Sequence, residues 1–121
     1  MSYHNDMISV ILRNKVNLEW ALMMFDTSVE SDVNFDRGDF DILVRGTDCF
    51  TGEHTVAVVE VKGNLGLVSH FYRKQLPKYR EQFPNGKHFV VYGDCVRKDL
   101  NFDNFIFVDA KDLEKKYDLF D

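Results

Sequence analysis

The chain has 121 residues, of which 45% are hydrophobic and 14% aromatic, and its net charge is −5. This length is that of one ordinary domain, so we expect a single domain over residues 1–121. The aromatic content excludes a disordered chain. The negative charge argues against a protein whose whole surface binds nucleic acid.

The N-terminus and the cysteines indicate an intracellular protein. Residues 1–6 lack a basic stretch followed by an apolar run, and no window reaches the roughly 18 apolar residues of a membrane span. Cys49 and Cys95 lie far apart without metal-ligand spacing, which is typical of reduced thiols. We therefore expect a cytoplasmic protein without membrane contact or disulfide.

The first half of the chain predicts a helix and a hairpin. Apolar residues recur at helical spacing over residues 7–25, which the polar residues near Asn14 could interrupt. Two β-branched or apolar runs over residues 39–45 and 55–61 are separated by turn residues. These two runs predict strands joined as a hairpin.

The second half predicts a helix, two strands and a final helix. Residues 68–83 have helical spacing, and Pro77 requires either a kink or a restart of the helix with the proline in its first turn. Short apolar runs at 88–92 and 105–108 predict strands, and residues 111–119 predict a last helix. This order indicates a mixed α/β layer structure with a hairpin portion and parallel crossover additions.

Acidic and basic side chains are segregated along the chain. Between Asp26 and Asp41 there are six acids and a single basic residue, Arg37. From His70 to Arg80 there is no acid but there are four basic residues, Arg73, Lys74, Lys78 and Arg80. Such a run is either a solvated helix face or a surface that contacts phosphate groups.

Charged side chains within the two hairpin strands are the informative feature. Alternation puts Glu60 and Lys62 on one face of their strand. In the other strand it groups the residues into two faces, namely Asp39, Asp41 and Leu43 on one and Phe40, Ile42 and Val44 on the other. If the strands are neighbours, Asp41 approaches Glu60, and Lys62 lies one pleat beyond.

Two carboxylates this close predict a site for a hard divalent cation. They repel each other, and one would hold a proton unless a cation lay between them. Mg²⁺ or Mn²⁺ takes oxygen ligands, so Asp41, Glu60 and the backbone carbonyl of Val61 are the candidate metal ligands. Lys62 could stabilise charge on a phosphate, or orient or deprotonate the attacking water.

Asp41 followed nineteen positions later by Glu60-Val61-Lys62 resembles the core of the PD-(D/E)XK nucleases. The resemblance covers roughly residues 19–92. It implies an α/β restriction-endonuclease-like fold, with a mixed β-sheet core flanked by helices in αβββαβ order. Phe40 replaces the proline of the family's name, and Asp39 and Asp36 remain alternative first ligands.

Two further elements resemble those of the same superfamily. Gln75 and Tyr79 match the Gln-X-X-X-Tyr element of its RecB-like members, and residues four apart share a helix face. Glu19 is the candidate for a glutamate that the family often carries on its first helix. The histidines show no pairing suited to zinc or a nucleophile, and we interpret all four as structural or surface residues: His4, His54, His70 and His88.

The resemblance implies a Mg²⁺-dependent nuclease that hydrolyses DNA, with RNA left open. Asp41, Glu60, Lys62, Gln75 and Glu19 would be catalytic. The basic run and Tyr79 would bind the backbone of the substrate. Small relatives include archaeal and phage Holliday-junction resolvases, which act as dimers. The resemblance therefore implies structure-selective or weakly sequence-specific cutting, with junction resolution as one form of it and a homodimer as one assembly. The alternative is an inactive nuclease-fold module that binds nucleic acid or a protein partner.

Overall fold

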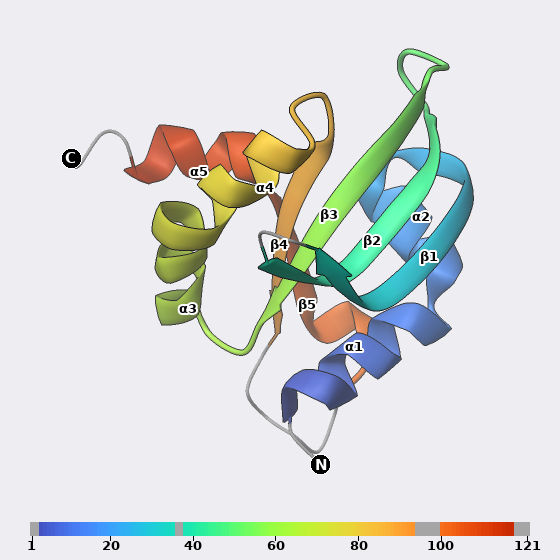
Figure 1. Ribbon diagram of the computed structural model, residues 1–121. Coiled ribbons are helices and arrows are strands. Elements are labelled where there is room, and N and C mark those ends of the chain that lie inside the picture. The colour runs from blue at the N-terminus through green and yellow to red at the C-terminus, as the bar shows by residue number, and fades with distance from the viewer. Residues whose placement is uncertain (1–2, 36–37, 94–99, 118–121) are drawn as a thin grey trace.

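Five strands form one mixed sheet in a computed structural model that describes residues 3–35, 38–93 and 100–117. The strands follow sequence order across the sheet, and β3 and β4 are parallel while all other neighbours are antiparallel (Figure 1). Their bounds are β1 (Met24–Phe35), β2 (Gly38–Asp48), β3 (His54–Lys62), β4 (Lys87–Gly93) and β5 (Phe105–Asp109).

Helices cover both faces of this sheet. The first face carries α1 (Tyr3–Arg13) and α2 (Lys15–Leu22). The second carries α3 (Leu65–His70), a π-helix η1 (Phe71–Gln75), α4 (Leu76–Gln82) and α5 (Ala110–Tyr117). A short 3₁₀ turn, η3 (Phe102–Asn104), precedes β5. The expected mixed sheet flanked by helices is confirmed.

The central strand β3 is buried on both faces, which explains its nearly continuous apolar sequence. Val59 and Val61 pack against α1 and α2, whereas Val58 packs beneath α3 and α4. Each fully buried side chain of this size contributes about 1.5–3 kcal/mol to folding. Glu60 lies inside this apolar run and is only 5% exposed, so its carboxylate needs specific partners.

The N-terminal segment differs from the expected single helix over residues 7–25. The chain breaks at Asn14, as its polar neighbours indicated, but the second helix ends at Leu22 and β1 begins at Met24. Met23 ends α2 in the left-handed conformation. The strand β1 was not predicted, because Asp26 and Asp32 adopt positive φ and interrupt the alternation that identifies a strand.

The expectations for Pro77 and for the last strand had different outcomes. Pro77 lies in the first turn of α4, directly after the π-helix, so the predicted restart is confirmed. The strand β5 pairs antiparallel with β4, and the expected parallel addition is wrong at this edge. The end of the predicted last helix, residues 118–119, lies outside the described residues.

The predicted face of Phe40 is also wrong. Phe40 packs with Leu43 and Tyr79 in the cluster under α4, and not on the side of Ile42 and Val44. The pairing of β2 with β3 ends at Ile42 and Val59, so Phe40 pairs only with Val33 of β1. The adjacent Asp32 of β1 has a positive φ, which interrupts the regular alternation at this point of the ladder.

Two features bear on the expected compartment. Cys49 is exposed and makes no disulfide, while Cys95 lies outside the described residues. No helix in the described parts of the chain is long and apolar enough to cross a membrane.

A glycine allows β1 to approach β2 closely, and its replacement should destabilise the fold. A Cβ at Gly46 would lie 2.8 Å from Cγ2 of Thr27 and 2.9 Å from the carbonyl oxygen of Phe25. We expect Gly46→Ala to lower the free energy of unfolding by about 1–3 kcal/mol in urea denaturation. Gly63→Ala is the control, since its Cβ meets Tyr3 at an ordinary 3.7 Å. Equal stability of the two variants would contradict this account.

Candidate active site

The Asp41 carboxylate lies where β2 and β3 separate. The last pair between these strands is Ile42 with Val59, one residue short of Asp41 and Glu60. Oδ2 of Asp41 accepts a hydrogen bond from the backbone N–H of Val61 at 2.8 Å. His4 of α1 brings Nε2 to 3.1 Å from the same oxygen. The carboxylate is thus fixed between the diverging strand ends and the first helix.

Glu60 is the centre of the site and is held by two side chains. Lys62 donates from Nζ to Oε1 of Glu60 at 3.1 Å, and both side chains are largely buried. The Tyr79 hydroxyl lies 3.2 Å from Oε2 of Glu60 and 2.8 Å from the carbonyl oxygen of Asp39. The structure therefore brings Asp41, Glu60, Lys62 and Tyr79 together at the C-terminal end of the central strand β3.

Burial and the neighbouring Asp41 charge raise the pKa of Glu60 to about 7, although Lys62 opposes the shift. Near neutral pH this carboxyl therefore holds a proton far more readily than an ordinary glutamate does. Burial and the charge of Glu60 raise the pKa of the Tyr79 phenol well above its ordinary value. Tyr79 consequently keeps its proton and acts as a donor at the site.

The donor set of the site fits a hard divalent cation that retains several waters. Asp41 and Glu60 offer carboxylate oxygens. In a strand the N–H and C=O of one residue point toward the same neighbouring strand, and the N–H of Val61 donates to Asp41 of β2, so the Val61 carbonyl is directed to the β2 side as well. No group of three or more His, Cys, Asp or Glu side chains among the described residues could hold a metal. Among the described residues the site therefore brings together two carboxylates and no third ligand of this kind, so any such ion would take its other ligands from backbone, water and substrate.

Gln75 lies one turn before Tyr79, at the last residue of the π-helix. Its side-chain oxygen is buried and has no hydrogen-bond partner within the described residues. A buried acceptor of this kind is costly unless water or a ligand satisfies it. π-helical turns are often found at functional sites. Gln75 therefore has unused hydrogen-bonding capacity next to the residue that binds Glu60.

Other sequence candidates lie elsewhere or take another role. Glu19 accepts hydrogen bonds from the hydroxyl and backbone N–H of Thr27, at the start of β1, and the structure does not bring it to Asp41. Asp39 contributes its backbone carbonyl to Tyr79, while its side chain is exposed. Asp36 lies outside the described residues.

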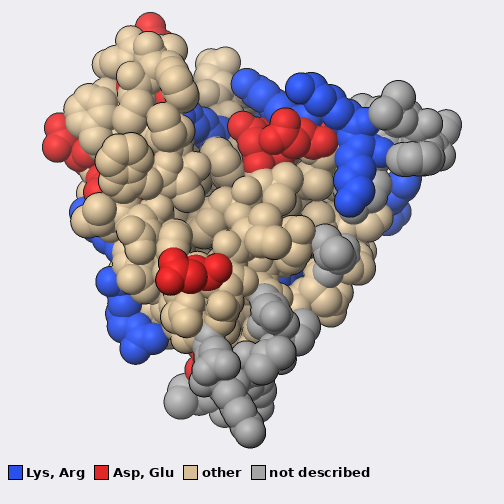
Figure 2. Space-filling view, turned by 180° about the vertical axis from the view of Figure 1, so that it is seen from behind, with Lys and Arg blue, Asp and Glu red and all other residues tan. Residues whose placement is uncertain are grey.

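The basic run divides in space. Lys74 and Lys78 are exposed on the outer side of the helix that carries Tyr79, and Arg73 is also exposed. Arg80 instead forms an ion pair with Glu114 of α5. On the face shown in Figure 2, acidic and basic side chains lie in adjacent groups and form no broad basic field among the described residues. On this face the basic side chains are therefore confined to small groups.

His4 is a site residue that the sequence interpretation missed. It lies 37 positions before Asp41, and no local spacing joins the two. One signal was present, since His4 lies four residues before the buried Ile8 and so falls on the inward face of the first turn of α1. Its nitrogen adds a polar group to the oxygen donors of the site.

Comparisons with known proteins give no independent identification. Neither a scan against protein-family models nor searches of curated proteins and of solved structures found a match.

The raised pKa of Glu60 predicts a stability that depends on pH. The folded state binds the proton more tightly than the unfolded state, so stability falls as pH rises from 4.5 to about 7 and is constant above that range. Glu60→Gln lacks this titration. Between about pH 5 and about pH 8 we therefore expect its free energy of unfolding to rise by about 2–3 kcal/mol relative to that of the natural chain.

Urea denaturation at the two pH values, with metal ions removed by EDTA, measures this difference. Glu30→Gln, at an exposed position of β1, is the matched control and should show no such change. A Glu60→Gln curve parallel to that of the natural chain would contradict the assignment.

Proposed function

We propose that the chain is a Mg²⁺- or Mn²⁺-dependent nuclease that hydrolyses DNA phosphodiester bonds. The observation that carries the proposal is the buried Glu60 carboxylate, which lies against Asp41, Lys62 and Tyr79 at the separating ends of two strands. An arrangement that forces two carboxylates together in an apolar strand is costly for folding alone. A divalent cation between the two carboxylates would offset their repulsion, and it would also activate the water that attacks the phosphate.

Asp41, Glu60 and the Val61 carbonyl would hold the metal ion. Mg²⁺ at this position would stabilise negative charge on the phosphate and lower the pKa of a bound water. The proton that Glu60 carries near neutral pH would be lost when the ion binds, so affinity for the ion should increase with pH. His4 could contribute a nitrogen or release Asp41, since it contacts the same carboxylate oxygen.

The remaining side chains of the site have complementary roles. Lys62 is held at 3.1 Å from Glu60 and would turn its ammonium toward the phosphate, or orient the attacking water. Tyr79 would fix Glu60 through its hydroxyl. Gln75 would use its unsatisfied oxygen to bind a water or a substrate donor.

The basic residues on the outer side of η1 and α4 support backbone binding. Lys74 and Lys78 are exposed and four residues apart, so they share one helix face. Contacts to phosphates hold a nucleic acid without reading its sequence. We therefore propose a structure-selective or weakly sequence-specific enzyme, with junction resolution as one form of that activity and RNA as an alternative substrate.

The mixed sheet supports the finer fold proposal. A hairpin that carries the acids, a parallel β4 beyond β3 and helices on both faces are what a restriction-endonuclease-like core implies. The extra strand β5 and helix α5 extend this arrangement at one edge.

Loss of either the carboxylate or the lysine should abolish cleavage. We expect Asp41→Asn and Lys62→Ala each to lower the Mg²⁺-dependent cleavage rate by about 100-fold or more, as removal of a group that stabilises the transition state does. The measurement is cleavage of labelled single-stranded, duplex, flap and four-way-junction DNA with Mg²⁺, Mn²⁺ or EDTA.

The exposed Asp103→Asn and Lys115→Ala are matched controls and should retain full activity. Asp39→Asn tests the alternative first ligand. Undiminished cleavage by Asp41→Asn would remove the proposal. No cleavage by the natural chain, with salt-sensitive DNA binding retained, would instead favour the non-catalytic binding module.

The helix that carries Lys74 and Lys78 should determine the salt dependence of DNA binding. Each phosphate contact contributes about 0.9 to the slope of log affinity against log salt concentration. The double variant Lys74→Ala/Lys78→Ala should therefore reduce that slope by about 2. Lys111→Ala/Lys115→Ala on α5 has the same spacing and exposure and is the control. An equal effect of the two double variants would exclude a specific role in DNA binding for the helix face that carries Lys74 of η1 and Lys78 of α4.

A further inference from the structure

One part of the sheet has no helix over it on the side that carries α3, α4 and α5. The apolar cluster beneath these helices reaches β2 only at Phe40 and Leu43, and α2 packs on the opposite face (Figure 1). Beyond Leu43 the side chains on this side of β1 and β2 are polar and at least partly exposed. We call them the β2 strip: Ser28 and Glu30 of β1, and Arg45 and Thr47 of β2.

Arg45 is a half-buried cation without a partner. Its guanidinium carries five N–H donors, yet it makes no hydrogen bond or ion pair within the part of the chain that the structure describes. Its direct neighbours across the ladder, Ser28 and Val56, are uncharged. Acidic partners are not scarce, since the chain has 20 acids against 15 Lys and Arg residues. A partly desolvated cation of this kind favours an anion from outside the chain.

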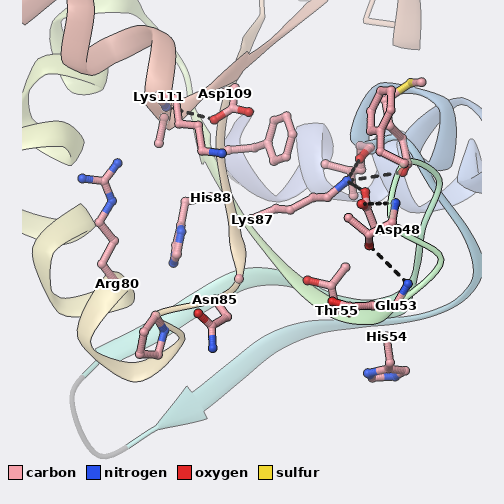
Figure 3. Close-up of a pocket in the computed structure, with 18 of the residues that line it drawn as sticks. Asp48, Glu53, His54, Thr55, Arg80, Asn85, Lys87, His88, Asp109 and Lys111 are labelled. Atoms are coloured by element: carbon pink, nitrogen blue, oxygen red, sulfur yellow. Dashed lines mark hydrogen bonds and ion pairs between the residues drawn. The ribbon is translucent and has the colours of Figure 1, made fainter.

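The other half-buried cations among the described residues are neutralised within the fold. They form three ion pairs, Lys62 with Glu60, Arg80 with Glu114 and Lys87 with Asp48. The last two pairs line a pocket of about 820 Å³ at the end of β2 that lies away from Asp41, and Figure 3 shows Lys87 turned toward Asp48 there. The contrast identifies Arg45 as the half-buried cation that is available to a ligand.

Arg45 lies on the same strand as Asp41 and on the same side of the sheet as the candidate active site. The Tyr79 hydroxyl reaches Glu60 from α4, so the site belongs to the helical side that the β2 strip continues. Asp41 and Arg45 are four residues apart on β2, which is about 13 Å at about 3.3 Å per residue. A duplex has one phosphate per about 3.4 Å of axis on each strand, so this distance corresponds to about four nucleotides.

The surroundings of Arg45 leave room for a phosphate chain on one side. A hollow of about 240 Å³ lies between the start of β3 and the end of α4, and it is lined by Val56, the ladder partner of Arg45, and by Phe83. On the other side β1 presents the exposed carboxylate of Glu30. Because like charges repel, phosphates are disfavoured over β1 and favoured between β2 and α4.

We propose that the β2 strip binds the sugar–phosphate backbone of the substrate, with Arg45 holding a phosphate about four nucleotides from the bond that is cut. This inference rests on the proposed nuclease function and adds a substrate requirement to it. The planar guanidinium can donate two parallel hydrogen bonds to one phosphate and reads no sequence. The substrate strand must therefore continue beyond the cut on the side of Arg45, so the enzyme would cut inside a strand and would not release single nucleotides from that end.

The first measurement is binding of a labelled single-stranded oligonucleotide in EDTA, where no cleavage interferes. Arg45→Met keeps the aliphatic stem and should unfold at the same urea concentration as the natural chain. It should weaken binding by about tenfold and lower the slope of log affinity against log salt concentration by about 0.7. Arg13→Met, at an exposed position of α1, is the matched control and should change neither quantity.

Arg45→Lys separates the charge from the shape of the guanidinium. It should keep the salt slope of the natural chain, because the charge remains, and should lose affinity, because an ammonium cannot make two parallel bonds. A slope that falls as far as in Arg45→Met would overturn the inference. It would also be overturned by equal slopes for Arg45→Met and the natural chain, or by a natural chain that binds no DNA.

The second measurement gives the position of the contact. One uncharged methylphosphonate linkage is moved stepwise away from a main cut in a labelled strand. About four nucleotides from the cut on one side, it should slow cleavage by the natural chain about tenfold, and it should have no further effect in Arg45→Met. An equal further effect in both proteins would contradict the assignment to Arg45. Binding that depends on Arg45 without any cleavage would support the phosphate site and remove only the proposed catalysis.

Discussion

The hydrogen bond from the Val61 N–H to the Asp41 carboxylate is the interaction on which the site depends. The pairing of β2 with β3 ends at Ile42 and Val59, two residues before Val61, so the N–H of Val61 has no backbone partner in β2 and donates to the Asp41 side chain instead. An unsatisfied buried donor would cost about 1–3 kcal/mol. The same bond fixes Asp41 beside Glu60 and thereby creates the charge repulsion that a cation can relieve. One structural contact therefore sets both the end of the ladder and the electrostatics of the site.

Glu60 shows how the apolar core and the chemistry are linked. Its neighbours Val59 and Val61 belong to one core cluster and Val58 to the other, so the strand cannot move toward water without exposing both. The carboxyl must therefore be neutralised where it is, by a proton, by Lys62 or by a cation. The Tyr79 hydroxyl keeps its proton and supports any of these states as a donor.

The sequence predicted the hairpin strands and the meeting of Asp41, Glu60 and Lys62, because local alternation determines both. It did not predict β1, because this segment is rich in acids and its residues Asp26 and Asp32 adopt the left-handed conformation, so it lacks the regular alternation that identifies a strand. It also missed His4, and it placed Glu19 at the site although Glu19 binds Thr27. These contacts join different elements and depend on how α1 and α2 pack, which no local pattern records. The restart at Pro77 was predictable, whereas the π-helix before it was not.

Tyr79 links the two ends of β2. Asp41 and Asp48 are seven residues apart on this strand, which is about 23 Å at about 3.3 Å per residue. At the Asp41 end the hydroxyl of Tyr79 contacts Glu60. The backbone carbonyl of the same residue accepts from the ring of His88, which lines the pocket that also contains Asp48. The position of the Glu60 carboxylate therefore depends on how α4, which carries Tyr79, packs over the whole length of the sheet.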